Sequence, residues 1–221
     1  MQLKRSARRK VGAKPTESTC MERLKFEEAE AKISQINIVM MGLPGAGKST
    51  LVNSIKPKPN YISLGEITRR ELQTDSDLSR QIMAQFGHNN SWSADFVISV
   101  VAPHILKVKD VGFILDGLPR QKSEAEDLVA WARRNGVRLN LALYLDVREE
   151  VALQRISQRD SSGRLETPEH YRKRMQAYLD ERPLFMDIID ANFEKSLSID
   201  TSDISPDEVK SKLIEFIASN F

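Results

Sequence analysis

The residues best suited to chemistry in this chain lie in the segment GLPGAGKST (residues 42–50), directly after the apolar run INIVMM (36–41). The segment fits the pattern G-x-x-x-x-G-K-[ST], in which glycines let backbone N–H groups turn towards a phosphate. A helix-like stretch follows, so the positive end of a helix dipole adds to the charge of Lys48. The segment therefore predicts a P-loop that binds a nucleoside triphosphate.

A second candidate group follows another apolar run, in GFILDGLPR (112–120). Asp116 ends this run, and a carboxylate at the carboxyl end of a strand beside a P-loop can hold Mg²⁺ through water ligands. The hydroxyl of Ser49 in the P-loop is the other candidate metal ligand. A helix cap is the alternative role for Asp116, because Asp-Gly also suits a turn. We expect Mg²⁺, bound together with the nucleotide, as the cofactor.

Arginines are spaced along the rest of the chain in a way that suits a ligand with several negative charges. An exposed helical arginine is usually only solvated, but a P-loop ligand gives such residues a partner. The candidates are Arg69, Arg120, Arg155, Arg159, Arg164 and Arg174.

Short apolar runs alternate with stretches of helical periodicity, which is the pattern of a parallel sheet covered by helices on both faces. A leading helix is expected within residues 21–35, and Pro183 should kink or break the long helix that contains it. The expected strands are 36–41, 61–64, 112–116, 141–147 and 197–200. The expected helices are 48–55, 66–73, 77–86, 94–108, 121–134, 148–158, 169–192 and 206–219.

Composition is that of a soluble globular enzyme, with 221 residues, 40% of them hydrophobic and 29% charged. One cysteine cannot form an internal disulfide, and no apolar run is long enough to span a bilayer, so we expect a cytoplasmic protein without membrane partners. Residues 1–14 hold six Lys/Arg and no acid, whereas the remaining chain has 27 Lys/Arg against 31 Asp/Glu. We expect residues 1–20 to form a disordered basic tail and no nucleic-acid partner; an organelle transit peptide or a nucleic-acid arm is the alternative.

From about Ile36 to Phe216 the chain resembles the adenylate kinases or, more broadly, the nucleoside monophosphate kinases. GLPGAGKST resembles the family's P-loop, YISLGEITRREL its monophosphate-binding stretch and FILDGLPR its most diagnostic signature. YLDVREEVALQRISQR, SSGR, YRKRMQAY and the late SID…DEV resemble the rest.

This resemblance implies an α/β fold of the P-loop NTPase type, with a five-stranded parallel sheet and helices on both faces. A single kinase domain (36–221) would carry a small monophosphate-binding insertion at about 64–95 and a short lid at about 159–168. The implied activity is reversible transfer of the γ-phosphoryl group of ATP to a nucleoside monophosphate, AMP by family default, by a monomer.

The resemblance also implies a role for each site residue. Lys48 follows the β- and γ-phosphates, and Asp116 orders the waters of Mg²⁺. Arg69 and Arg120 clamp the phosphate of the acceptor, and Arg155 lies against the donor base. The implied catalytic residues are Lys48, Asp116, Arg120, Arg159, Arg164 and Arg174. The implied donor contacts are Gly42, Pro44, Gly45, Ala46, Gly47, Lys48, Ser49, Thr50 and Arg155. The implied acceptor contacts are Leu64, Gly65, Arg69, Trp92, Gly117, Arg120 and Glu124.

The acceptor site departs from the family pattern. Leu64 stands where a Thr or Ser is usual, and NNSW (89–92) replaces GKLV. Glu124 takes the place of the glutamine that reads adenine, and a carboxylate only accepts hydrogen bonds, which suits the N1 and N2 donors of guanine. The acceptor could therefore shift towards GMP or dGMP, unless Gln121 reads the base or Glu124 lies in solvent. The lid lacks the family's Asp-Asp pair, near which only Glu166 stands.

Three other functions compete with this interpretation. A GTPase would read guanine with N-K-x-D, which the chain lacks. A kinase for another small acceptor, such as a sugar acid or shikimate, would not obviously need DGLPR together with the later arginines. A catalytically inactive nucleotide-binding regulator would suit the altered acceptor site, although the chain retains Lys48, Asp116 and every phosphate arginine.

Overall fold

The computed structural model describes residues 17–86, 92–158 and 168–221. Its strands are β1 (Asn37–Met41), β2 (Tyr61–Ser63), β3 (Phe113–Asp116), β4 (Leu141–Asp146) and β5 (Lys195–Asp200). Its helices are α1 (Glu17–Ile33), α2 (Lys48–Ser54), α3 (Leu64–Glu71), α4 (Asp77–Phe86), α5 (Ala94–Leu106), α6 (Lys122–Arg134), α7 (Glu149–Ser157), α8 (Pro168–Asn192) and α9 (Pro206–Asn220).

The five strands form one parallel sheet in the order β2-β3-β1-β4-β5. All residues of the central strand β1 are buried, because helices cover the sheet on both faces. Met40 of β1 lies opposite Asp116 of β3 in the ladder. The carboxyl ends of β1 and β3 are therefore neighbours, and the loop after β1 lies next to Asp116.

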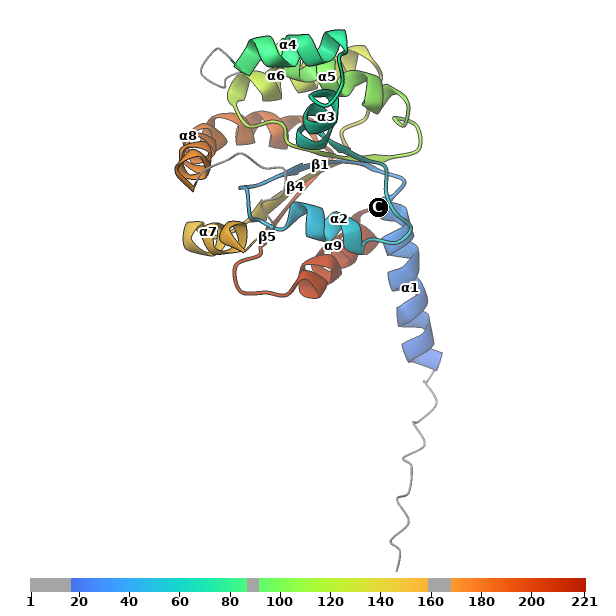
Figure 1. Cartoon of the computed structure of the whole chain (residues 1–221). Coiled ribbons are helices and arrows are strands. Elements are labelled where there is room, and N and C mark those ends of the chain that lie inside the picture. Colours follow the sequence, from blue (N-terminus) through green and yellow to red (C-terminus); the bar gives the residue numbers. More distant parts are fainter. Residues whose placement is uncertain (1–16, 87–91, 159–167) are drawn as a thin grey trace, which may run out of the picture.

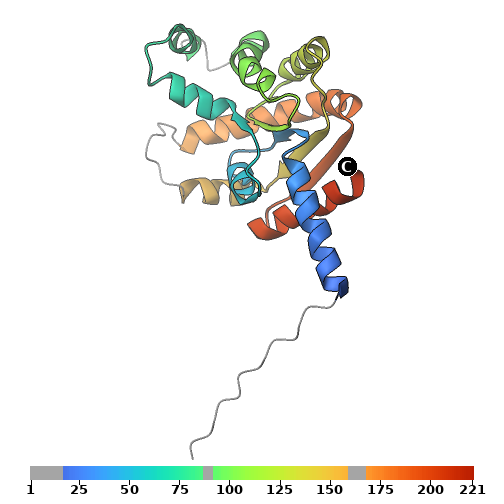
Figure 2. The same cartoon turned by 90° about the vertical axis from the view of Figure 1, so that its right-hand side faces the viewer.

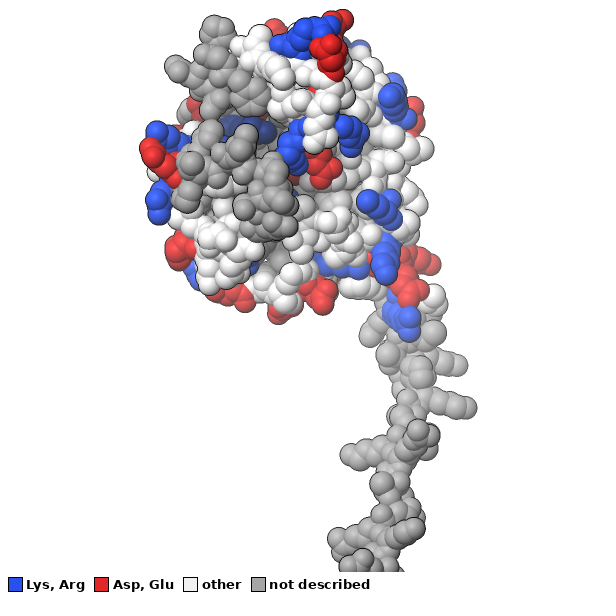
Figure 3. Space-filling model, in the orientation of Figure 1, with Lys and Arg blue, Asp and Glu red and all other residues white. Residues whose placement is uncertain are grey.

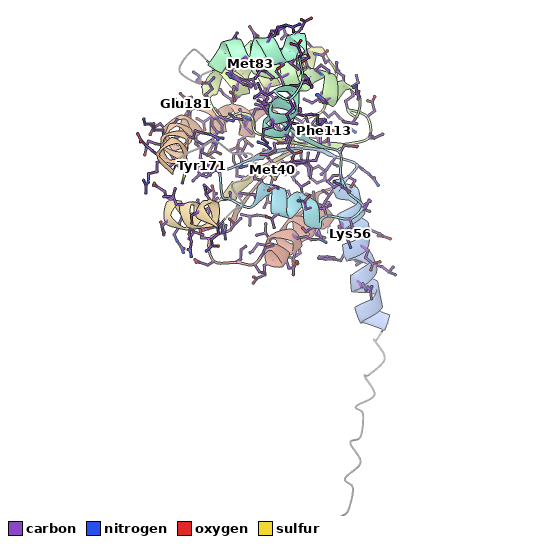
Figure 4. The ribbon with its side chains drawn as sticks, in the orientation of Figure 1. Met40, Lys56, Met83, Phe113, Tyr171 and Glu181 are labelled. Carbon is purple, nitrogen blue, oxygen red and sulfur yellow. The ribbon has the colours of Figure 1, made fainter. Side chains whose placement is uncertain are left out.

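Two hydrophobic layers enclose the sheet. Helices α3, α5, α6 and α8 supply apolar side chains to one layer, and α1, α2 and α9 supply the other. Figures 1 and 2 show α3 to α6 on one side of the sheet and α2 and α9 on the opposite side. Met40 and Phe113, both fully buried, lie at the centre of the molecule in Figure 4, whereas Met83 of α4 lies on its outer surface. This packing fixes where the loops that follow the strands begin.

Helix α1 begins at Glu17, so residues 17–20 belong to a helix and their assignment to the tail was wrong. Its last turns pack on α9, with Ala29 and Ile33 buried. Glu30 forms an ion pair of 2.5 Å with Lys210 of α9. Figure 2 shows the first turns of α1 reaching away from the domain. The leading helix is thus anchored to the rest of the domain by its C-terminal half.

The predicted fold class is confirmed, since all five expected strands form one parallel sheet. Strand β5 begins at Lys195, two residues earlier than predicted. The prediction missed these two residues because their side chains are exposed and form no apolar run. Helix α8 continues through Pro183, so the predicted break does not occur. Phe185 and Ile189, both fully buried in the core, hold the second half of this helix in place.

The predicted insertion at 64–95 corresponds to α3, α4 and the start of α5, and its role stays a prediction. The predicted lid (159–168) lies outside the described residues except for Pro168, which begins α8. In the part of the chain that the structure describes, no helix has the length and apolar character needed to cross a membrane.

Candidate active site

The P-loop connects β1 to α2 and is tightly packed at one point and open at another. A Cβ built on Gly45 would lie 2.7 Å from the carbonyl oxygen of Ala152 in α7, so the loop presses on that helix. A Cβ built on Gly47, the N-cap of α2, would meet no heavy atom within 4 Å. The loop is therefore open at the N-terminus of α2, where backbone N–H groups and the helix dipole favour an anion.

Lys48 and Asp116 meet at this opening. The Nζ of Lys48 donates to the carbonyl oxygens of Gly42 (2.7 Å) and Leu43 (3.1 Å) and lies 3.9 Å from Oδ1 of Asp116. The side chains of Lys48 and Asp116 are only 16% and 13% exposed. Oδ2 of Asp116 accepts a hydrogen bond of 2.6 Å from the hydroxyl of Tyr61. Charged groups so little exposed interact more strongly than they would in water.

The donor set fits the Mg²⁺ that the P-loop implies. Oδ1 of Asp116 is buried and accepts no hydrogen bond from the described residues. A buried carboxylate oxygen without a donor is costly unless another partner satisfies it, and a metal-bound water is such a partner. Ser49, the other candidate ligand, lies in the first turn of α2 with its side chain exposed.

A cavity of about 300 Å³ lies beside the P-loop, between α2, α7 and the loop after β5. Arg155 of α7 lines it, and its guanidinium donates to the carbonyl oxygen (2.6 Å) and hydroxyl (3.2 Å) of Thr201 and to the carbonyl oxygen of Gly45 (3.4 Å). The rest of the lining is largely apolar and includes Leu51, Ile204, Pro206 and Val209. An arginine beside apolar walls can hold a flat aromatic base.

Two arginines lie at the carboxyl ends of β2 and β3. A Cβ built on Gly65 would lie 3.2 Å from Nη1 of Arg69, and one built on Gly117 would lie 3.4 Å from Nη2 of Arg120. Nε of Arg120 also donates to the carbonyl oxygen of Gly117 (2.6 Å). Leu64 lies between these groups, with its Cβ 3.2 Å from the built Cβ of Gly117. The fold therefore brings Arg69 and Arg120 to one sheet edge.

The remaining predicted arginines are distributed differently. Arg174 lies on α8, two turns before the proline of that helix, and is partly buried. Arg159 and Arg164 lie outside the described residues. Figure 3 shows basic side chains interspersed with acidic ones on the face that it displays.

Comparisons with known proteins agree with this geometry. The family model for adenylate kinase matches residues 40–195. An adenylate kinase of Stenotrophomonas maltophilia (strain R551-3) is 33% identical over 152 residues, which cover 66% of this chain and 81% of that protein. An adenylate kinase of Prochlorococcus marinus (strain AS9601) is 30% identical over 144 residues, covering 64% of this chain and 78% of that protein.

The chain belongs to the adenylate kinase family. It is a nucleoside monophosphate kinase, which transfers a phosphoryl group from ATP to a nucleoside monophosphate. The resemblance predicted from the motifs is thus confirmed. Membership of the family also favours a kinase over a catalytically inactive regulator.

Within this adenylate kinase fold, Glu124 is almost fully buried, so the alternative that it lies in solvent is wrong. It stands in the first turn of α6, where Oε2 accepts a hydrogen bond of 2.7 Å from the backbone N–H of Arg120. Burial raises the pKa of the Glu124 carboxyl, and the nearby Arg120 guanidinium partly offsets that rise. Its carboxylate thus fixes the loop that carries Arg120.

Two other predicted acceptor residues pack against the core. Leu64, at the start of α3, is 2% exposed and belongs to the apolar layer of α3, α5, α6 and α8. Trp92 packs edge to face on Phe96, with ring centroids 5.2 Å apart. These contacts give both side chains a packing role, and their contact with an acceptor stays a prediction.

Sequence reasoning missed two residues at the site. Tyr61 bonds to Asp116, and its place at the start of an edge strand carried no functional signal. Thr201 is 3% exposed, and its hydroxyl lies 3.0 Å from the carbonyl oxygen of Asp146 and 3.2 Å from that of Ala46. Because Thr201 directly follows β5, its position at the carboxyl edge of the sheet was the signal that could have identified it.

Proposed function

We propose that this protein transfers the γ-phosphoryl group of Mg²⁺-ATP reversibly to AMP, giving two ADP molecules. The observation that carries the proposal is the meeting of Lys48 and Asp116 at the open side of the P-loop, 3.9 Å apart. A lysine and a strand-end carboxylate in this arrangement are what P-loop enzymes use for a triphosphate and its metal.

The donor would lie along the P-loop, with its base in the cavity that Arg155 lines and its phosphates before the N-terminus of α2. Ser49 and Asp116 would hold Mg²⁺, whose charge would offset that of the phosphates. Lys48 would leave the carbonyl oxygens of Gly42 and Leu43 for the β- and γ-phosphates. The P-loop residues Pro44, Ala46 and Thr50 complete the proposed donor contacts.

The acceptor would lie at the carboxyl ends of β2 and β3, where Arg69 lies beside Gly65 and Arg120 beside Gly117. Guanidinium groups bind phosphate oxygens in pairs, which fixes the acceptor phosphate for in-line attack. That phosphate is already ionised at neutral pH, so the reaction needs no general base. Arg159, Arg164 and Arg174 would neutralise the group in transfer.

AMP is the first candidate acceptor and GMP or dGMP is the second. A guanine-reading carboxylate needs both oxygens for the N1 and N2 donors of the base. One oxygen of Glu124 already accepts a hydrogen bond from the backbone N–H of Arg120. This bond gives Glu124 a structural role, because it holds the loop that carries Arg120. Because this structural role explains Glu124 without a contact to the base, the adenylate kinase family default, AMP, stays the first candidate.

Steady-state turnover of ATP against AMP, GMP, CMP, UMP and their deoxy forms tests the proposal. We expect the highest kcat/KM with AMP, and Lys48→Met should lower kcat by about a thousandfold without lowering the Tm. Preference for GMP, reversed by Glu124→Gln, would select the second candidate. Binding of ATP without turnover of any acceptor would overturn the proposal.

A further inference from the structure

The hydroxyl of Tyr61 makes a short hydrogen bond to the strand-end carboxylate of the site. Tyr61 begins β2, and Ser63, two residues later, lies opposite Asp116 in the ladder. Because side chains two residues apart share one face of a strand, the phenol points along β2 towards Asp116. The hydroxyl reaches Oδ2 of Asp116 at 2.6 Å. An ionised carboxylate only accepts, so the phenol is the donor.

A tyrosine phenol is neutral at physiological pH and so can donate a hydrogen bond. A hydrogen bond from a hydroxyl to an ionised carboxylate is about twice as strong as one between neutral groups. The bond therefore holds the carboxylate of Asp116 in one orientation.

This orientation gives the two oxygens of Asp116 different environments. Oδ2 has the Tyr61 hydroxyl, whereas Oδ1 lies 3.9 Å from Nζ of Lys48 and accepts no hydrogen bond from the described residues. The terminal torsion of an aspartate is soft, so without a partner on Oδ2 the carboxylate plane could turn. A turned carboxylate would no longer face the P-loop opening.

We propose that Tyr61 is a positioning residue whose hydroxyl holds Oδ1 of Asp116 towards Lys48 and the water ligands of Mg²⁺. The inference rests on the proposed role of Asp116 at the metal. Removing a residue that hydrogen-bonds to a metal-site side chain without contacting the metal typically lowers metal affinity by about 10- to 100-fold. Loss of the hydroxyl should thus weaken the response to Mg²⁺ and leave metal-free ATP binding intact.

The test compares Tyr61→Phe with Tyr144→Phe, each of which removes one phenol hydroxyl. The control hydroxyl, on β4, also bonds to a carboxylate, that of Asp190 at 3.4 Å. The rise in Tm is measured for each full-length protein with ATP in EDTA and with ATP and increasing Mg²⁺. The Mg²⁺ dependence of turnover is measured in parallel.

We expect Tyr61→Phe to keep the wild-type Tm rise with ATP in EDTA and to need about tenfold more Mg²⁺ for the further rise and for half-maximal turnover. Tyr144→Phe should match the wild type in both responses. In an Asp116→Asn background, adding Tyr61→Phe should cause no further loss of the Mg²⁺ response.

A wild-type Mg²⁺ response in Tyr61→Phe would overturn the inference. So would an equal loss of the ATP response in EDTA, because Tyr61 would then support the strand or loop and not the metal site. The Tm measurement needs no acceptor. If the wild type binds Mg²⁺-ATP but turns over no monophosphate, the proposed function fails, while the comparison of Tyr61→Phe with wild type still tests the role of Tyr61.

Discussion

Two P-loop glycines allow a test that separates fold stability from ATP binding. Gly45 and Gly47 have φ angles of 91° and 89°, so alanine at either position is strained in the same way. The two sites differ in the space that a methyl group would find. At Gly45 it would lie 2.7 Å from the carbonyl oxygen and 2.9 Å from Cα of Ala152, both backbone atoms, whereas at Gly47 it would meet nothing.

The expected costs follow from these distances. The left-handed backbone costs an L-residue about 1–2 kcal/mol at either position. Overpacking against α7 adds about 1–3 kcal/mol for Gly45→Ala alone. For a chain of this size, about 2–4 °C of Tm is lost per kcal/mol. We therefore expect Tm decreases of about 2–8 °C for Gly47→Ala and about 4–20 °C for Gly45→Ala.

ATP binding should rank the two variants in the opposite order. The methyl of Gly47→Ala would enter the open space at the N-terminus of α2, where the phosphates are expected, and should weaken ATP binding by about tenfold or more. Thermal melts without nucleotide and calorimetric titration of ATP measure the two effects. Gly136→Ala is the matched control, because Gly136 has φ 63° and open space around it. Equal Tm losses at Gly45 and Gly47, or unchanged ATP affinity in Gly47→Ala, would refute the reasoning.

Three further changes test other parts of the molecule. Arg120→Lys should lower kcat by about a hundredfold with little change in ATP affinity, because a lysine cannot bind phosphate in a bidentate way; steady-state kinetics and ATP titration check this. Burial raises the pKa of the Glu124 carboxyl, so its protonated form stabilises the fold below the ordinary value of 4.5 and this stabilisation is lost as the pH rises through the raised pKa. Glutamine does not titrate, so melts should show the wild-type Tm falling relative to that of Glu124→Gln as the pH rises above 4.5. Parallel curves of Tm against pH would contradict this. Glu30→Ala removes the acidic partner of Lys210 and the acceptor of the Lys56 N–H. It should lower the free energy of unfolding by about 2 kcal/mol without lowering kcat, which thermal melts and steady-state kinetics would measure.

Local sequence patterns were sufficient for the fold class and for one half of the site. A β-branched apolar run followed by a glycine-rich loop and a lysine specifies a strand, a phosphate loop and a helix from neighbouring residues alone. The run that ends on Asp116 likewise predicts a buried strand with a carboxylate at its end. Parallel pairing then places both loops at one sheet edge, so Lys48 and Asp116 had to become neighbours.

The acceptor side depended on contacts that no local pattern describes. Whether Glu124 reads a base or caps a loop depends on which groups its carboxylate meets, and in the fold it accepts the backbone N–H of Arg120. Leu64 stands at a position implied to contact the acceptor, yet its side chain packs into the core, because the start of α3 faces the layer that covers the sheet.

The residues that only the tertiary structure identified are those whose partners lie far away in the sequence. Tyr61 and Asp116 are 55 residues apart, and Thr201 and Ala46 are 155 residues apart. Tyrosine at the start of a strand and threonine after one are ordinary residues there, and periodicity reports which face a side chain occupies but not which group it meets. The sequence by itself determined the strands, the P-loop and the charged residues at their ends. The sheet order and helix packing decided which hydroxyl orients which carboxylate, because a hydrogen bond requires two groups to be held within about 3 Å of each other.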